Sequence, residues 1–390
     1  MGFAAVTGGY LAVTTAEWVV PPLFPVLAPV LGLGTGTAGL VFAVLGVAIA
    51  TGGLVGGFAL VRVGPRVGIV VGLTLVAAGA VVCATADGLP RLLAGEVVLG
   101  LGSGTFFAPG VHSAGALAGE RRRGIAIGIY GVAFSAGVAL AGLLAALGDT
   151  WGWRVSFLAT AGIAFAAALA LVPFRLAAVR RQEGARPPFR LRAAVAPLAV
   201  GGVTAASQYG TVAFLPLYAV HAWGLSPGKA ALVITVSRVL SVPAKLLTGN
   251  AADREGSLRI ARRLGVVLAL LGAWWTLAPG PEAAVGGAIL FGAVVAALGP
   301  VGNVLALDAF AGRGQLLGAF RSAQIGLGAA TSAILGAGAA VVGLRPMLVV
   351  TSIAIPASLL ALRLGSAGAA PEAERGEQGV DAVVEGALEP

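Results

Sequence analysis

Long hydrophobic runs alternate with short polar stretches along the chain, and charged residues fall almost entirely in the polar stretches. Each run is apolar on every face, whereas a transmembrane β-strand alternates apolar and polar positions, so a β-barrel is disfavoured. An α-helix needs roughly 20 apolar residues to cross a bilayer. The runs therefore predict an all-α membrane protein with twelve transmembrane helices, over about residues 4–27, 36–60, 67–86, 90–113, 124–147, 154–173, 194–220, 228–250, 261–279, 283–307, 315–342 and 345–363.

The composition excludes a water-soluble enzyme. Of the 390 residues 58% are hydrophobic and 11% are charged, whereas a soluble domain carries about 25% charged residues. The 61 glycines suit helices that pack closely in lipid. One cysteine and two histidines give no basis for a disulfide or a structural metal site.

The distribution of basic residues predicts the orientation in the membrane. With the N-terminus inside, the inner loops and the C-terminal end hold 18 of the 25 lysines and arginines, and the outer loops hold 4. This asymmetry is typical of cytoplasmic loops, so we expect both termini in the cytoplasm. It also accounts for the net charge of +9 without nucleic-acid binding.

The chain divides at its longest polar connection, the basic segment 174–193, which we interpret as a cytoplasmic linker. It separates two predicted six-helix bundles, residues 1–173 and 194–364. The acidic tail, residues 365–390, has the composition of a disordered segment.

The two predicted bundles repeat one another in sequence. Glu17 and Trp18 align with Gln208 and Tyr209 at an offset of 191 residues. The same offset relates further pairs: Pro25 and Pro216, Pro109 and Pro300, Gly152 and Gly343, and Arg154 and Arg345. Two parallel repeats that meet at a central cavity are a known plan of transporters.

Two loops carry glycines and charged residues in similar spacing. The loop after the second span contains Gly57, Arg62, Gly64 and Arg66, and the loop after the eighth contains Gly249, Asp253, Arg254 and Gly256. Both resemble the G-x-x-x-D-R-x-G-[RK]-[RK] loop motif of the major facilitator superfamily. The first copy departs from the motif, because Val61 stands where the family has Asp. In the fifth span, Gly137 and Gly142 match part of the family's antiporter motif.

The resemblance covers all twelve spans. It implies two pseudo-symmetric six-helix bundles that rock around a site near the membrane midplane, with the loop motifs as parts of the conformational switch. It further implies a monomer in the bacterial inner membrane that needs no cofactor, is not an enzyme, and has the proton as its coupling ion. The expected partners are a small-molecule solute and the lipid bilayer, and no nucleic acid.

Glu17 is the strongest candidate for a proton-carrying residue. It lies about 13 residues into the first span, near the midplane, where a charged carboxylate is costly and usually serves a function. The repeat places Trp18, Gln208 and Tyr209 at the same depth, and we expect all four to line one cavity. Glu96, in the fourth span, is a second candidate for a proton site.

Three basic residues also lie within predicted spans. Arg238 is near the midplane, where it either pairs with Glu17 or receives an anionic group of the solute. Arg321 has Gln324 on the same helix face, and both Arg321 and Lys245 are near enough to the inner surface to extend toward it.

These features favour a secondary active transporter that exports a small organic solute by proton-coupled alternating access. The alternative is proton-coupled uptake of a small organic anion that binds Arg238. A non-transporting receptor with the same fold and a membrane-embedded enzyme are further alternatives, although the chain contains no H-E-x-x-H or G-x-S-x-G motif.

Overall fold

The structure is a computed structural model that describes residues 1–118, 123–174, 176, 191–310 and 314–362. Most of the predicted linker and the whole predicted tail lie outside these residues. Within them every regular element is helical. The α-helices are α1 (Gly2–Trp18), α2 (Val20–Leu31), α3 (Thr35–Arg62), α4 (Pro65–Ala84), α5 (Leu89–Ala118), α6 (Arg123–Trp151), α7 (Trp153–Leu171), α8 (Val195–Ala205), α9 (Leu215–Trp223), α10 (Pro227–Glu255), α11 (Ser257–Leu277), α12 (Pro281–Ala309), α13 (Gly314–Val342) and α14 (Leu344–Ala357).

The described residues form twelve helical segments that are long and apolar enough to cross a membrane. This confirms the predicted number of spans. The predicted separation of residues 261–279 from 283–307, and of 315–342 from 345–363, is also correct, since α12 begins at Pro281 and a break at Gly343 separates α13 from α14.

The first and seventh spans are interrupted helices. The first is α1 followed by α2, which opens with Pro21 and Pro22 near its first turn, so the chain bends where backbone N–H donors are missing. The seventh runs through α8, the π-helical turn η3 (Ala206–Thr211), the short 3₁₀ turn η4 (Val212–Phe214) and α9. Such π-turns occur frequently at functional sites.

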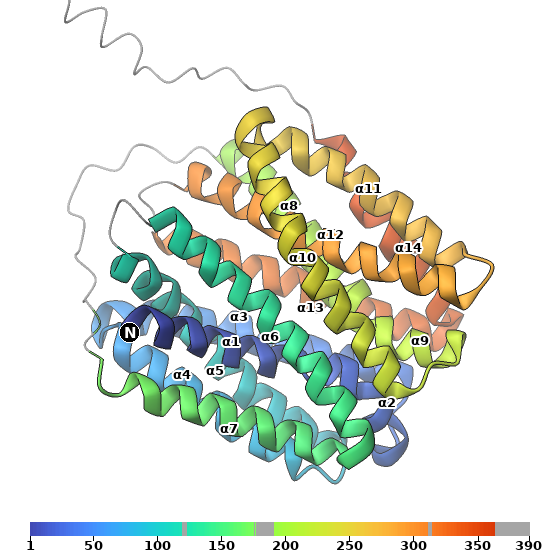
Figure 1. Cartoon of the computed structure of the whole chain (residues 1–390), viewed down its shortest axis with the longest axis horizontal. Coiled ribbons are helices and arrows are strands. Elements are labelled where there is room, and N and C mark those ends of the chain that lie inside the picture. Colours follow the sequence, from blue (N-terminus) through green and yellow to red (C-terminus); the bar gives the residue numbers. More distant parts are fainter. Residues whose placement is uncertain (119–122, 175, 177–190, 311–313, 363–390) are drawn as a thin grey trace, which may run out of the picture.

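The two halves of the chain lie side by side (Figure 1), with α1–α7 in blue to green and α8–α14 in yellow to red. Helix α3 packs on α13, and α6 packs on α10. Hydrogen bonds join both pairs of helices. Ser322 donates to the Ala50 carbonyl at 3.1 Å, and Thr235 donates to the Ala139 carbonyl at 3.0 Å.

Glycines with positive φ angles show the internal repeat directly. Among the described residues they form three pairs at offsets of 191 or 192 residues, and each pair has nearly the same φ: Gly32 (64°) with Gly224 (65°), Gly64 (86°) with Gly256 (91°), and Gly152 (94°) with Gly343 (89°). Because residues with a Cβ rarely adopt this conformation, the two halves use glycine at the same helix ends.

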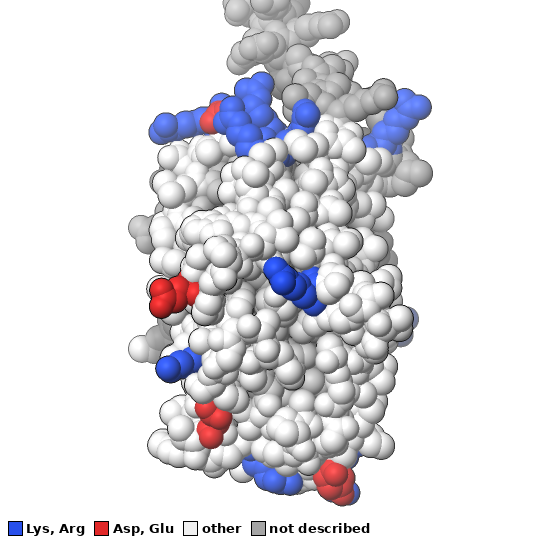
Figure 2. Space-filling view, turned by 90° about the vertical axis from the view of Figure 1, so that its right-hand side faces the viewer, with Lys and Arg blue, Asp and Glu red and all other residues white. Residues whose placement is uncertain are grey.

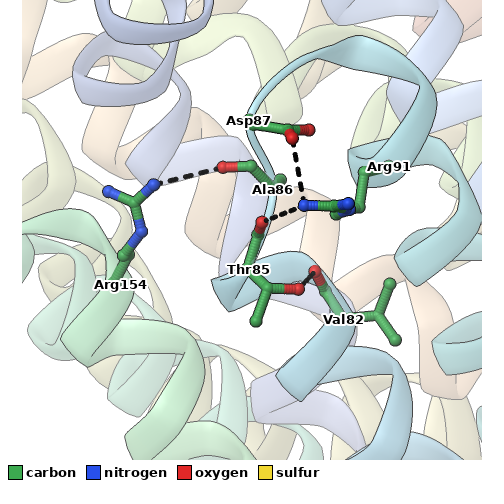
Figure 3. A network of polar contacts seen from close by, with 6 residues as sticks. All are labelled: Val82, Thr85, Ala86, Asp87, Arg91 and Arg154. Carbon is green, nitrogen blue, oxygen red and sulfur yellow. Dashed lines mark hydrogen bonds and ion pairs between the residues drawn. The ribbon is translucent and has the colours of Figure 1, made fainter.

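An arginine fixes the same turn in each half. Arg154, at the start of α7, donates to the Ala86 carbonyl at 3.3 Å (Figure 3), beside the Arg91–Asp87 ion pair of 3.0 Å. In the second half Arg345 donates twice to the Thr276 carbonyl, at 3.1 and 3.3 Å. The alignment of Arg154 with Arg345 in the sequence repeat therefore reflects a shared structural role. The exact boundaries of the two bundles stay a prediction.

The surface separates charge from apolar area as a membrane protein requires. In Figure 2, basic side chains gather at the upper end of the molecule, and the side below is mostly white, with a few separate blue and red side chains. A side with so few charged residues suits contact with lipid. The location of the termini relative to the membrane stays a prediction from the basic residues.

Helices α3 and α5 approach closely because Gly104 has no side chain. A Cβ at Gly104 would lie 2.1 Å from the Ile49 carbonyl oxygen and 2.4 Å from the Gly53 nitrogen. Gly104→Ala is therefore expected to lower the free energy of unfolding by about 1–3 kcal/mol, as a methyl group forced into a packed core does. Thermal unfolding of the purified protein measures the change.

Gly162→Ala is the matched control, because nothing lies within 4 Å of a Cβ at Gly162 on α7. Its midpoint should stay the same or rise slightly, since alanine favours helix. Equal destabilisation by both substitutions would contradict the close approach of α3 and α5.

Candidate functional site

A pocket lies between the two halves, and we call it the central pocket. Its cavity volume is about 20 Å³, room for about one water molecule. Helices α1, α3 and α5 of the first half and α13 of the second supply its lining: Tyr10, Glu17, Ile49, Gly53, Gly104, Phe107, Ala108, Gly318, Arg321, Ser322 and Ile325. Both halves contribute walls, so relative motion of the halves would change access to it.

Glu17 is the carboxyl group of the central pocket. It is buried, and its Oε1 accepts a hydrogen bond of 2.7 Å from Ser103 Oγ on α5. Among the described residues it forms no ion pair, since the two that occur are Arg91–Asp87 and Arg263–Glu255. Arg321 in the same pocket interacts with Glu17 electrostatically without forming an ion pair. A buried carboxyl held by a neutral hydroxyl in this way can gain and lose a proton as its surroundings change.

Arg321 enters the central pocket from the other half. Its Nη1 donates to Gln324 Oε1 at 2.8 Å, and its guanidinium carbon lies 4.9 Å from the centre of the Phe107 ring. The predicted proximity of Arg321 and Gln324 is thus seen. Arg321 does not extend toward the surface as predicted, because the Gln324 amide and the Phe107 ring hold it in the pocket wall.

Trp18, Tyr209 and Arg238 meet beside the pocket, and we call them the aromatic–arginine cluster. The Trp18 and Tyr209 rings have centroids 5.5 Å apart, and the Arg238 guanidinium carbon lies 5.2 Å from the Trp18 ring centroid. All three side chains are buried. Trp18 follows Glu17 on α1, so α1 points one residue into each site.

The π-turn η3 sets the position of Tyr209. It widens the helix at Gln208 and Tyr209, the residues that the repeat relates to Glu17 and Trp18. Ser332 on α13 donates to the Tyr209 carbonyl at 2.5 Å, which satisfies a backbone group near the widened turn. Gln208 is buried, and it is not part of the central-pocket lining.

Glu96 lies apart from both sites. It is fully buried between α4 and α5, where Cys83 Sγ lies 3.5 Å from its Oε1 as a donor. It does not belong to the lining of the central pocket. The structure therefore places Glu96 inside the first half, in contact with Cys83, and not between the halves.

The loop-motif residues act at helix ends. Gly64 and Gly256 take the positive φ angles noted above, and Arg66 donates to the Val172 carbonyl. Arg62 lies over the Phe58 ring at 4.3 Å. The remaining motif residues show no comparable constraint: a Cβ at Gly57 or Gly249 would meet nothing within 4 Å, and Asp253 and Arg254 take part in neither ion pair of the described residues.

Lys245 does not extend toward the surface as predicted, because it bonds with α6 of the other half. Its ammonium donates to Ser135 Oγ at 2.6 Å and to the Gly131 carbonyl at 3.4 Å, both on α6 of the other half. Ser135 Oγ lies 2.9 Å from Ser241 Oγ, so a short polar chain crosses the α6–α10 interface.

Sequence reasoning missed Ser103, Tyr10 and Phe107. Ser103 stands in the glycine-rich stretch 100–104, and a hydroxyl among glycines in a membrane span was the only signal for it. Tyr10 stacks on Tyr130 with ring centroids 4.1 Å apart, in a packing pattern that the sequence does not show.

Comparisons with known proteins agree with this architecture. Residues 6–201 match the family model described as the Major Facilitator Superfamily. A "Chloramphenicol resistance protein" of Streptomyces lividans is 31% identical over 337 residues, which are 80% of this chain and 82% of that protein.

Solved structures share the fold at lower identity. A D-xylose–proton symporter superposes with a TM-score of 0.74 at 18% identity, covering 92% of this chain and 96% of that chain. The transporter FucP in its outward conformation gives a TM-score of 0.66 at 14% identity, covering 92% and 97%. At these identities the likeness shows the fold alone.

Proposed function

Because the chain belongs to the major facilitator superfamily, we propose that it is an exporter that moves a small organic solute across the bacterial inner membrane in exchange for protons. As a member of this family it is a multi-pass membrane transporter and not an enzyme. The identity of the solute, the direction of transport, the coupling ion and the membrane in which the protein lies are the parts that we propose.

The observation that carries the proposal is the position of Glu17. A buried carboxyl without a fixed counter-ion lines a pocket whose walls come from both halves. When the halves move, the water and charge around Glu17 change, and with them the free energy of its ionised form. Binding and release of a proton at Glu17 are thereby coupled to which side the pocket faces.

The proposed direction of transport rests on the name of one relative. The Streptomyces lividans protein is named for resistance to chloramphenicol, and resistance to a drug is a common result of export. The partial antiporter motif at Gly137 and Gly142 agrees with exchange. Gly142 also lies at the α6–α10 interface, where a Cβ would be 2.3 Å from Thr235 Oγ1.

Transport by proteoliposomes under an imposed pH gradient tests the proposal. Three radiolabelled aromatic probes cover the charge classes: chloramphenicol (neutral), benzenesulfonate (anion) and phenyltrimethylammonium (cation). We expect at least one probe to accumulate when the lumen is acidic, because outward proton flow then drives the solute inward. A protonophore should abolish the accumulation.

Two results would contradict this mechanism. Accumulation only with an acidic exterior would mean symport and therefore uptake. If all three probes enter no faster than they enter protein-free liposomes, the protein does not transport such solutes. If the rates are the same with and without the protonophore, the transport is not coupled to protons.

Ser103→Ala tests the support of Glu17. Without the hydroxyl the carboxyl loses its 2.7 Å hydrogen bond, and such a bond to an ionisable group is worth about 1.5–3 kcal/mol. We expect the proton-driven rate to fall about tenfold while the protein still folds. Thr105→Ala is the control, since Thr105 donates within its own helix to the Leu101 carbonyl; equal loss in both variants would argue against a specific role of Ser103.

A further inference from the structure

We infer that the transported solute is an aromatic organic anion, whose negatively charged group binds Arg238 and whose ring packs against Trp18. This inference rests on the proposed transport function and adds the chemical class of the solute. It is independent of the direction of transport.

Arg238 is a buried cation whose N–H groups have no hydrogen-bond acceptor among the described residues. Its side chain is 0% exposed, and its Nε and both terminal nitrogens have no hydrogen-bond acceptor among the described residues. Guanidinium groups in protein interiors are normally paired, because an unpaired buried charge is strongly unfavourable. A group with five N–H donors and no acceptor points to a ligand that supplies acceptors.

The neighbouring unsatisfied group is also a donor. The indole nitrogen of Trp18 is buried without a hydrogen-bond partner, on the ring over which the Arg238 guanidinium lies. Indole N–H only donates, as the guanidinium does. Both groups are therefore satisfied by the same kind of ligand atom, an oxygen that accepts.

The electrostatic surroundings favour a negative charge. Glu17, next to Trp18 in sequence, accepts a hydrogen bond from Ser103 and lines the central pocket. The Glu17–Arg238 ion pair, one of the two alternatives for Arg238, therefore does not form. Lys245 lies two helical turns from Arg238 on α10, and the two positive charges repel each other. An anionic group near Arg238 lowers this repulsion as well as pairing the guanidinium.

The aromatic rings define the rest of the solute. Trp18 and Tyr209 lie 5.5 Å apart at an angle of 35°, with Trp18 on the first half and Tyr209 on the second. At this spacing the two rings contact each other, so we expect the ring of the solute to pack against the edges of the pair and not between them. A carboxylate or sulfonate suits the Arg238 fork, because several oxygens can accept from its N–H groups at once.

Equilibrium dialysis of the purified full-length protein in detergent tests the inference without any proton gradient. The probes are benzenesulfonate, benzenesulfonamide and phenyltrimethylammonium, which share a ring and differ in charge. We expect benzenesulfonate to bind at least about tenfold more tightly than the other two. Arg238→Gln should weaken its binding about 10- to 100-fold, the loss expected for hydrogen bonds to a charged group.

Two further variants separate a specific contact from general damage. Arg238→Lys keeps the charge and loses the fork, so its affinity should fall between wild type and Arg238→Gln. Arg91→Gln removes an arginine from an exposed ion pair far along the chain and should bind as wild type does.

The inference is overturned if the cation or the neutral sulfonamide binds as tightly as the sulfonate, if Arg238→Gln leaves sulfonate binding unchanged, or if the sulfonate fails to bind at millimolar concentration. Because dialysis needs no transport, its result is distinct from that of the proteoliposome assay. Arg238-dependent binding without proton-driven transport would refute the proposed function and leave the binding site standing.

Discussion

Glu17→Gln should abolish proton-driven transport and leave solute exchange intact. Glutamine has the size of glutamic acid and still accepts from Ser103, but it carries no proton that can be released. The protein can then bind solute and reorient without a proton. We expect the rate of accumulation driven by a pH gradient to fall by at least about 100-fold, the usual size of the effect when an essential proton-transfer group is removed.

Counterflow measures the solute exchange that we expect Glu17→Gln to retain. Proteoliposomes loaded with unlabelled solute should exchange it for labelled solute at a rate close to that of wild type, with no gradient applied. Loss of both activities would mean that Glu17 maintains the structure and does not carry the proton.

Glu96→Gln is the matched control for this experiment. Among the described residues Glu96 is the one other buried carboxyl, and it lies against Cys83 inside the first half, outside the lining of the central pocket. Proton-driven transport should persist in Glu96→Gln. If this variant and not Glu17→Gln lost the coupling, the proton site would have to be assigned to Glu96.

Arg238→Met should make the ligand-free protein more stable. Methionine is similar in length to arginine and apolar, and replacing a buried charge group by a packed hydrophobic residue often stabilises a protein by about 1–4 kcal/mol. The guanidinium has no protein acceptor to lose. The thermal midpoint in detergent should therefore rise relative to wild type, while the response to benzenesulfonate disappears.

The opposite result would change the interpretation of Arg238. A lowered midpoint in Arg238→Met would mean that the cation–π contact with Trp18, at 5.2 Å, and other contacts hold the helices together. Arg91→Gln calibrates the measurement, because its exposed ion pair should contribute less than about 1 kcal/mol.

Hydrophobic patterning was sufficient to predict the twelve spans, because lipid requires about 20 apolar residues in each helix. The repeat was also readable, since Gly152 and Gly343 serve the same turn with the same φ angle. Both features depend on local sequence. The interruption of the seventh span by η3 does not, because η3 (Ala206–Thr211) contains no proline and its one glycine, Gly210, is not distinguished from the many other glycines of the spans.

Depth along a helix could be predicted for the site residues, but not the direction of their side chains. Glu17 and Glu96 are both buried in the membrane region, yet Glu17 accepts from Ser103 and lines the central pocket, whereas Glu96 lies against Cys83. The partner of each depends on how the helices are rotated. For the same reason the sequence left two possible partners for Arg238, namely Glu17 and an anionic group of the solute. Only the three-dimensional packing excludes Glu17 as its ion-pair partner.

Simultaneous recording of solute and proton movement tests the central claim most directly. Proteoliposomes with an internal pH dye receive whichever of the three probes moves fastest, with wild type and Glu17→Gln in parallel. We expect solute entry in wild type to make the lumen more alkaline at a fixed ratio of protons to solute, and the proton signal to vanish in Glu17→Gln. Solute entry in wild type without any change in luminal pH would contradict proton exchange through this site.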